Sequence, residues 1–497
     1  MFRVNQLDGH VSDRRRIPEE ACIGGWVFDR LVMSDQVVHT HDGAPRPLKE
    51  YTVLIDNFLP SMPKAAIFVP VKGSSERIPS KNLQLLDGKP LFLHTLEKLS
   101  FLEDVDLYLD TESAEVVKLA SHLNGVQVMN RDPRLANNKT DGNCLFLNEV
   151  AHCSHDVVVQ HLCTSPFIEL DTIKKAISVV GGLQGSSQYD SALLVRREKQ
   201  YLWRDEQPIY DMNNIPNSVD LDDSVIETMG LYAVTREAAL CTLRRIGNKP
   251  YLLCASPLEA VDVNWPEDFD LAQLIAAGKR ENEQRLYANL ASVMTSALLS
   301  DLLDDLGYTN QIIRGLKRTS GSANAFGPAK TLKLREIQSN EDFKGIYRAL
   351  DHYLTLVPGD VICVENEVSS YAYFGGLNAN LAIRQGVRAV VVGGMTRDSS
   401  EVNRIGLPVY AEGITCQDVR GRAVLESMNK AIQIKGIAIV PGDLIFSDDE
   451  GVVVIPRRLQ NIVIEQMTAK FKNENSIVTD IAMGLATDEL VKTRGEF

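Results

Sequence analysis

The sequence predicts an α/β protein of at least two domains, because its two halves differ in the pattern of their predicted helices and strands. Across residues 64–278, strand-like apolar runs alternate with helix-like segments, as in an α/β layered fold. Beyond residue 297 strands dominate, and Pro-Gly-Asp occurs twice, each time just before an apolar strand. A chain of 497 residues is also too long for one ordinary core.

The elements of the first half follow from periodicity and end signals. AAIFVPV (65–71) is a strand, and the next apolar segment is a helix because Phe92, Leu96 and Leu99 recur at i, i+4 and i+7. Further predicted strands are VDLYLDT (105–111), DVVVQHL (156–162), SALLV (191–195) and MGLYAV (229–234). Further helices are DTIKKAISVV (171–180), opened by an Asp cap, and PEDFDLAQLIAAG (266–278), with Pro at its start and Gly at its end.

A charged helical segment, residues 279–297, is expected to join the two domains. The second-half strands are KTLKLREI (330–337), DVICVEN (360–366), RAVVVGG (388–394), IKGIAIV (434–440), DLIFS (443–447) and GVVVIP (451–456). We expect an extension of unknown role at residues 1–63, with short strands in CIGGWVFDRLVM and EYTVLIDNF, then domains at 64–278 and 298–497.

Composition excludes several classes of protein. A net charge of -14 and a pI near 5.2 argue against a nucleic-acid partner. No run of about 18 apolar residues exists, so no membrane partner is expected, and the charged N-terminus predicts a cytoplasmic protein. The eight cysteines form no CxxC pair and indicate reduced thiols, and the close histidine pairs lack a third metal ligand.

A basic loop follows the first strand. Lys72, Arg77 and Lys81 lie within ten residues in VKGSSERIPSKN, in an otherwise acidic chain. A small Gly-Ser loop offers free backbone N–H groups to phosphate oxygens, and three cations can neutralise a triphosphate. The loop lacks the GxxxxGK[ST] pattern, so it is not a Walker loop, and a solvated basic turn remains the alternative.

The text around this loop, PVKGSSERIPSKNLQLLDGKPLFLHTL, resembles the opening signature of the cytidylyltransferases that activate 2-keto-3-deoxy sugar acids (N-acylneuraminate, legionaminate or pseudaminate, and Kdo). RDPRLANNKTDGN, LCTSPFI, SVIETMGLYAVTREA and AVDVNWPEDFDLAQ resemble later segments of the same family, in the right order. The family often has Arg where this chain has Lys72, and often an Arg after its T-S-P loop, where Ile168 and Glu169 stand here.

This resemblance implies the site residues of the first domain. The nucleotide would be bound by Pro70, Val71, Lys72, Gly73, Ser74, Ser75, Arg77, Lys81 and Asn82, with Lys72, Arg77 and Lys81 catalytic. The sugar acid would contact Thr164, Ser165, Glu227 and Tyr232, and Mg²⁺ would be held by Asp262 and Asn264, where the family has two carboxylates. The implied reaction uses CTP and yields a CMP-sugar and pyrophosphate. Asp268 is either a helix cap or functional.

A second candidate site lies in GGLNANLAIRQGVRAVVVGGMTRDSS, where Arg397 and Asp398 follow a strand and a Gly-Gly turn. The Arg can bind a carboxylate and the Asp a divalent ion, although a surface ion pair remains possible on this stretch alone. Residues 290–460 resemble the class II pyruvate (4-hydroxy-4-methyl-2-oxoglutarate) aldolases, a family that includes the regulator of ribonuclease E activity A. The resemblance implies a substrate-binding loop at Gly375, Gly376, Leu377 and Asn378 together with Arg397, catalytic Arg397 and Asp398, and Mg²⁺ on Asp398.

Together the two resemblances imply a Rossmann-like nucleotidyltransferase domain, with a mixed, mostly parallel sheet and helices on both faces, fused to an α/β swivelling-type RraA-like domain. Both families usually form oligomers, so a homo-oligomer is expected. Three readings stay open: a bifunctional transferase and lyase, a cytidylyltransferase carried on a silent oligomerisation module, and a C-terminal regulator of an RNA-degrading enzyme. The family's loop Glu is missing and Gly393 replaces its Asp, whereas the retained Asp398 favours activity.

Overall fold

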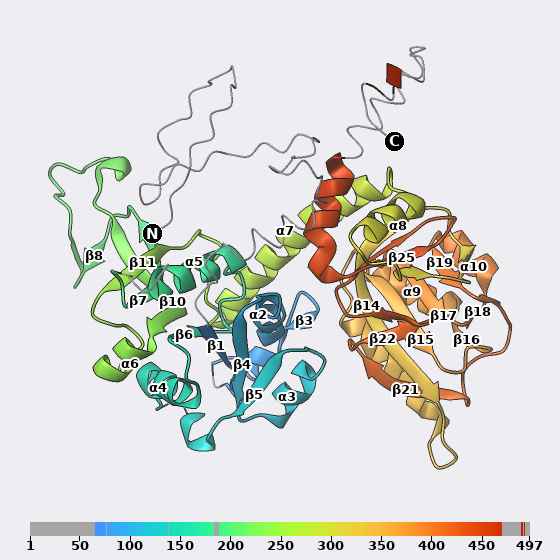
Figure 1. Cartoon of the computed structure of the whole chain (residues 1–497), viewed down its shortest axis with the longest axis horizontal. Helices are drawn as coiled ribbons and strands as arrows, with labels where there is room; N and C mark the ends of the chain where they lie inside the picture. The colour runs from blue at the N-terminus through green and yellow to red at the C-terminus, as the bar shows by residue number, and fades with distance from the viewer. Residues whose placement is uncertain are drawn as a thin grey trace, which may run out of the picture. The chain divides into compact units, whose positions relative to one another are not determined.

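The structure is a computed structural model that describes residues 65–75, 77–137, 139–182, 188–469, 489–490 and 492 (Figure 1). The short strands expected within residues 1–63 lie outside these ranges. The first half is built on a seven-stranded sheet in the order β11-β7-β10-β6-β1-β4-β5. Its strands are β1 (Ala65–Pro70), β4 (Val105–Thr111), β5 (Val126–Asn130), β6 (Val157–His161), β7 (Ser191–Glu198), β10 (Ser224–Thr235) and β11 (Pro250–Cys254).

The sheet is mixed, as predicted. β6, β1, β4 and β5 are mutually parallel neighbours, whereas β10 runs antiparallel to both β6 and β7. From β1 the chain first adds strands on one side, β4 and β5, and then places β6 on the other side. The carboxyl ends of β1 and β6 therefore flank a topological switch point, where open α/β sheets bind their ligands.

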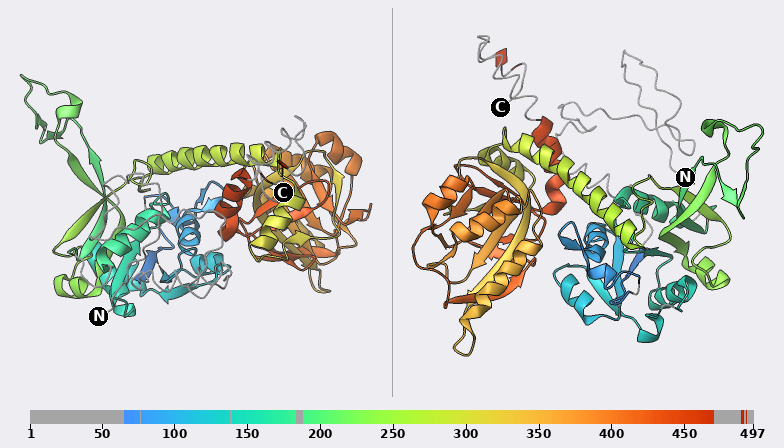
Figure 2. Two further views of the ribbon diagram at one scale, coloured as in Figure 1. Left: turned by 45° about the horizontal axis from the view of Figure 1, so that its top comes forward. Right: turned by 180° about the vertical axis from the view of Figure 1, so that it is seen from behind.

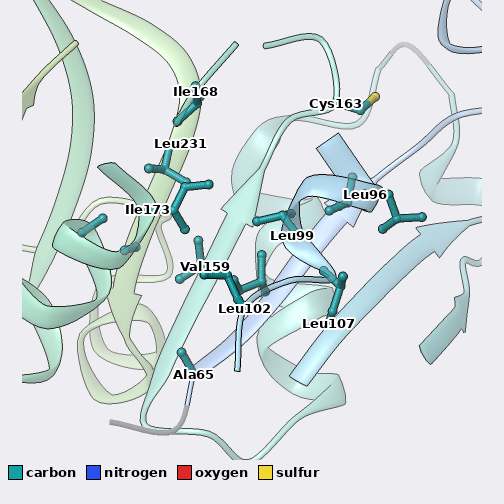
Figure 3. Packing of buried hydrophobic residues seen from close by; sticks show 14 of the residues in the cluster. Ala65, Leu96, Leu99, Leu102, Leu107, Val159, Cys163, Ile168, Ile173 and Leu231 are labelled. Atoms are coloured by element: carbon teal, nitrogen blue, oxygen red, sulfur yellow. The ribbon is translucent and has the colours of Figure 1, made fainter. Parts of the chain in front are cut away.

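Helices cover both faces of this sheet, which confirms the predicted layers. α2 (Leu91–Leu99), α3 (Ala114–Ala120) and α5 (Leu170–Gly181) pack on the face that carries Ile67 and Val159. α4 (Gly142–His152) and α6 (Arg236–Thr242) pack on the face of Phe68. In Figure 3, Val159 lies beside Leu99 and Leu102, with Leu231 and Ile173 close by. β1 and β6 are buried along almost their whole length, and successive side chains point to opposite faces, so these strands supply two apolar layers.

Two predicted helix ends were wrong. α7 runs from Pro266 to Ala291, through Gly278, so the predicted helix 266–278 and the linker from residue 279 form one helix. Gly278 does not end it because strong helix formers follow, and a lone interior Gly costs only about 1 kcal/mol. The N-cap of α5 is Glu169, which makes no side-chain cap bond, and the predicted cap Asp171 lies in the first turn.

The shorter elements of the first half are two hairpins, β2 (Leu85–Leu86) with β3 (Lys89–Pro90) and β8 (Trp203–Arg204) with β9 (Gln207–Pro208). The segment that carries β8 and β9, between β7 and β10, projects away from the sheet (Figure 2). Within the described residues, no single helix is long and apolar enough to cross a membrane, although the pair α7 and α8 (Ser296–Asp305), bent by 103°, passes that test together on length and composition.

The second half contains a nine-stranded mixed sheet and a short parallel one. The large sheet has the order β12-β25-β24-β14-β15-β17-β19-β13, with β21 also paired to β14. Its strands are β12 (Ile312–Ile313), β13 (Lys317–Ser320), β14 (Ala325–Glu336), β15 (Val361–Asn366), β17 (Ala389–Gly393), β19 (Val409–Ala411), β21 (Ala423–Met428), β24 (Leu444–Ser447) and β25 (Val452–Ile455). The short sheet joins β16 (Ala372–Phe374), β18 (Met395–Thr396) and β20 (Gly413–Ile414).

The described helical elements of this half are α8, α9 (Gly376–Arg384), α10 (Ser399–Ile405), two 3-10 segments (Phe343–Leu354 and Arg457–Leu459) and residues 460–469. Both Pro-Gly-Asp turns are confirmed, since Gly359 and Gly442 have φ of 96° and 88°. The predicted strand 434–440 was wrong: Lys435 and Gly436, both at positive φ, turn it into the hairpin of β22 (Ile432–Ile434) and β23 (Ile437–Ile439).

Candidate functional site

The basic loop leaves β1 at the switch point and is tied to its surroundings by the backbone. Val71 N–H donates to the carbonyl of Asp110 (2.8 Å), so the loop begins alongside the end of β4. The N–H of Gly73 donates to Glu112 Oε1 (2.8 Å), and the Asn82 side-chain amide donates to the carbonyl of Lys72 (2.9 Å). The bond from Asn82 to Lys72 thus closes the loop. Pro70 is the last residue of β1, Ser74 is exposed and Ser75 is half-buried.

The loop reaches the other predicted site residues through Lys81. The buried ammonium of Lys81 donates to the carbonyl of Val263, the residue after Asp262. Burial lowers the pKa of Lys81, while the nearby charge of Asp262 opposes that change. The guanidinium of Arg77 lies 5.3 Å from the ring centroid of Trp265. The structure therefore brings together residues that are about 180 positions apart in the sequence.

The T-S-P loop completes this grouping. It follows β6, and its Thr164 carbonyl accepts the N–H of Val263 (2.9 Å). The buried Ser165 hydroxyl donates to Asp262 Oδ1 (3.4 Å). The carboxyl ends of β1 and β6 and the start of α7 thus meet around Asp262, as the sequence resemblance implied.

The proposed metal ligands Asp262 and Asn264 contact each other, and Asn264 also contacts Asp268. Asn264 turns its amide nitrogen toward Asp262 Oδ2. Asp268 accepts the N–H groups of Asn264 (2.9 Å) and Trp265 (2.8 Å) through one oxygen, so it caps the start of α7. Among the described residues, no group of three or more His, Cys, Asp and Glu side chains could hold a metal ion. Mg²⁺ usually takes one or two carboxylates together with substrate phosphates, so Asp262 fits a cation that arrives with a nucleotide.

A buried polar network, which the sequence analysis missed, lies beneath the loop. Arg131 donates through Nε (3.0 Å) and Nη2 (2.8 Å) to the two carboxylate oxygens of Asp110. Gln160 donates to Glu149 Oε2 (2.7 Å). Burial raises the pKa of Glu149 well above its usual range, and the charge of Asp110 acts in the same direction. Arg131 therefore pairs with a buried carboxylate of the first domain, a contact that the sequence analysis of its segment did not predict.

Glu227 and Tyr232 lie together beside this centre because β10 is irregular between them. The pairing of β10 with β7 shifts register between these two residues, and Met229 within the shift has φ 61°. Bulges of this kind re-aim side chains. The Tyr232 hydroxyl donates to Glu227 Oε1. Burial raises the pKa of Tyr232, and the charges of Glu227, Arg245 and Asp262 all act on that hydroxyl.

The second candidate site gathers at the end of the short parallel sheet. Gly375 follows β16, Arg397 follows β18, and Asp418 lies beyond β20. Arg397 Nη2 is 2.9 Å from Asp418 Oδ2, and Arg397 Nε is 3.6 Å from Asp398 Oδ2. Asp418, which the sequence analysis missed, is therefore the closer of these two ion-pair partners. Its segment TCQD carries no motif that could have signalled this role.

The glycine loop is shaped by the carboxylates around it. A Cβ on Gly375 would lie 2.6 Å from Asp398 Oδ2, and one on Gly376 would lie 2.3 Å from Glu401 Oε2. The N–H of Gly376 donates to Asp398 Oδ2 (3.1 Å), so this amide, expected to receive a substrate carboxylate, is used within the protein. Asn378 donates to the carbonyl of Tyr373 (3.0 Å), and Leu377 is 82% exposed.

The remaining predictions concern cysteines and histidines, of which Cys163 lies at the first site with its Sγ 3.6 Å from the Pro70 carbonyl oxygen. The described cysteines are free thiols, which confirms their predicted state. His155 Nε2 pairs with Asp106 Oδ2 (2.9 Å), and His152 packs edge-on against Tyr108. Cys22, His39 and His41 lie outside the described residues.

Comparisons with known proteins match both halves. Residues 66–249 match the family described as Cytidylyltransferase, and residues 296–454 match the family described as Aldolase/RraA. A putative 4-hydroxy-4-methyl-2-oxoglutarate aldolase of Burkholderia mallei is 33% identical over 150 residues, covering 29% of this chain and 84% of that protein. Protein DlpA of Legionella pneumophila is 30% identical over 197 residues, covering 39% of this chain. The chain spans only 31% of the length of DlpA.

Solved structures include similar proteins for each half. A CMP:2-keto-3-deoxy-manno-octonic acid synthetase complexed with CTP aligns with 44% of this chain and 99% of its own, at 17% identity and a TM-score of 0.33. RraAS2 of Streptomyces coelicolor aligns with 38% of this chain and 94% of its own, at 22% identity and a TM-score of 0.35. Both TM-scores are below 0.5, so the family assignments rest on the sequence matches.

Proposed function

Because the chain belongs to the Aldolase/RraA family through residues 296–454 and carries a cytidylyltransferase domain at residues 66–249, we propose that its first half couples CTP to a 2-keto-3-deoxy sugar acid. The observation that carries this proposal is the bond from Lys81 to the Val263 carbonyl, which joins the basic loop to Asp262. The loop would bind the phosphates, and Asp262 would lie where the metal of a nucleotide is needed.

In the proposed reaction, the C2 hydroxyl oxygen of the sugar acid attacks the α-phosphorus of CTP. The bond from that phosphorus to the oxygen bridging to the β-phosphate breaks, pyrophosphate leaves, and the hydroxyl proton passes to solvent. Lys72, Arg77 and Lys81 stabilise the negative charge that builds on the phosphates. Asp262 and Asn264 would hold Mg²⁺, which supplies further charge neutralisation at the phosphates.

The test is CTP-dependent release of pyrophosphate from the full chain, with Kdo, N-acetylneuraminate and legionaminate offered in turn. Turnover with one of them is expected. Lys81→Met should lower kcat/KM for CTP by roughly 10- to 150-fold, since a charge-assisted bond contributes about 1.5–3 kcal/mol. Lys174→Met, on the exposed side of α5, is the matched control and should leave kcat/KM unchanged. Absence of turnover with every acid in the presence of Mg²⁺ would exclude the proposal.

For the second half we propose a Mg²⁺-dependent lyase acting on a 2-keto acid. Arg397, Asp398 and the Gly375–Gly376 loop gather at one end of the short parallel sheet, which favours an active site over a scattered surface pair. A 4-hydroxy-2-oxo acid is also the skeleton of the sugar acid proposed for the first half, so one compound could serve both. The alternative is a cytidylyltransferase carried on a silent oligomerisation module.

Pyruvate release from several 4-hydroxy-2-oxo acids, and from oxaloacetate, separates these two possibilities. The full chain should release pyruvate with Mg²⁺, and Asp398→Asn should abolish that release while leaving CTP turnover intact. If neither protein releases pyruvate, the silent module is the better description. The homo-oligomer expected from both families can be measured in the same preparations by sedimentation.

A further inference from the structure

Arg245 is a cation beside Glu227 and Tyr232 that no motif of the sequence assigned. Its guanidinium lies over the ring of Tyr232, 4.0 Å from the centroid. The same group is 3.9 Å from Glu227 Oε1, which is longer than a hydrogen bond. Tyr232 and Glu227 are two of the four residues that the family resemblance places at the sugar acid. Arg245 therefore belongs to the same cluster of side chains by contact, although it lies outside every segment that carries the resemblance.

The fold holds this arginine in place from three sides. Its backbone N–H donates to Asn143 Oδ1 (3.0 Å), at the start of α4. A Cβ on Gly142 would lie 2.7 Å from Arg245 Nη1, so the guanidinium packs directly on a glycine. The Tyr232 ring covers a further side, and only 20% of the Arg245 side chain is exposed. A planar fork held this way loses little side-chain entropy when it binds a planar anion.

Among the residues around Arg245, the carboxylate of Glu227 is too far from the guanidinium for a hydrogen bond. The family often has an Arg after its T-S-P loop, but here Ile168, which is fully buried, and Glu169 stand there. Glu227 approaches Arg245 only at 3.9 Å and already accepts the Tyr232 hydroxyl. A carboxylate of the substrate could take two parallel N–H bonds from the guanidinium, which are stronger and more specific than the existing contact.

We propose that Arg245 receives the carboxylate of the sugar acid and thereby sets the specificity of the pocket for acids over neutral sugars. This inference rests on the proposed function of the first half and adds the residue that recognises the acid group. Tyr232 and Glu227 then hold the guanidinium in orientation from one side. The C2 hydroxyl is adjacent to the carboxylate in a 2-keto-3-deoxy acid, so anchoring the carboxylate also orients the attacking oxygen.

The test compares a sugar acid with its own amide, in wild type and in Arg245→Met. The acid is whichever of Kdo, N-acetylneuraminate and legionaminate supports pyrophosphate release, and the amide lacks only the charge. Wild type should lose roughly 30-fold or more in kcat/KM from acid to amide, because losing one partner of a buried charge pair costs about 2 kcal/mol or more. Arg245→Met should show a similar loss with the acid and almost no further loss with the amide.

Two controls separate recognition from a merely structural role. Arg244→Met removes the neighbouring exposed arginine, whose Nη2 donates to Asn248 Oδ1 (3.0 Å), and should keep the wild-type preference for the acid. Arg245→Lys keeps the charge without the fork and should restore part of the preference. An Arg245→Met enzyme that turns over with the full wild-type preference for acid over amide would overturn the inference while leaving the proposed function intact. A wild type inactive with all three acids would overturn both.

Discussion

Replacing Arg131 by Met should destabilise the first half strongly, because it leaves the buried charge of Asp110 without a partner. The Asp110 side chain is 0% exposed and that of Arg131 is 3% exposed. Arg131 donates to both carboxylate oxygens of Asp110 and also to its carbonyl (2.8 Å). Removing one partner of such a pair typically costs about 3–5 kcal/mol. Glu149 cannot compensate, since a carboxyl group supplies no positive charge, and burial raises the pKa of Glu149 well above its usual range.

Tryptophan fluorescence is a selective assay for this prediction. The three tryptophans, Trp26, Trp203 and Trp265, all precede the second half, so fluorescence-detected urea unfolding of the full chain reports the first half. With a urea dependence of about 2–3 kcal/mol/M, the midpoint should fall by roughly 1–2.5 M. Asp110→Asn combined with Arg131→Met removes the orphaned charge and should recover much of the loss. If Arg131→Met unfolds at the wild-type midpoint, or the double variant recovers nothing, the charge-pair reasoning fails.

Three further outcomes are expected. Asp268→Ala should cost about 0.5–2 kcal/mol by fluorescence-detected urea unfolding, through the lost cap of α7, and a raised Mg²⁺ requirement would show that Asp268 is a ligand instead. Burial raises the pKa of Asp360 from 3.8 to about 6. The contribution of Asp360 to the free energy of unfolding is therefore complete below about pH 4 and is lost as the pH rises through about 6, a change of about 3 kcal/mol. Asp360→Asn should remove this pH dependence from calorimetric stability profiles. Gly386→Ala should lower the melting temperature of the second half more than Gly406→Ala. Both glycines have positive φ, but a Cβ on Gly386 would lie 2.8 Å from Pro358 Cβ, whereas a Cβ on Gly406 would have no atom within 4 Å. Equal losses of melting temperature in the two variants would contradict this reasoning.

The elements that local signals could predict are the ones with strong periodicity or strong turn residues. β1 and β6 were predicted from continuous apolar runs, and α2 was predicted from apolar residues at i, i+4 and i+7. The helix end at Gly278 was wrong because a glycine is only a weak stop when its neighbours favour helix. The strand over Ile434–Val440 was wrong because the turn at Lys435 and Gly436 carries no proline or asparagine signal beyond the glycine itself.

The sequence by itself determined the two-part α/β plan, the basic loop after β1 and the order of the family segments, because each depends on residues that are close together in the chain. Only the tertiary structure decided which side chains meet. It placed Arg245 over Tyr232, paired Arg397 with Asp418, made Asp268 a cap and committed Arg131 to Asp110. These contacts depend on how the fold brings distant strands and loops side by side. The two partners of such a contact have no fixed spacing in the sequence, so the sequence alone could not predict them.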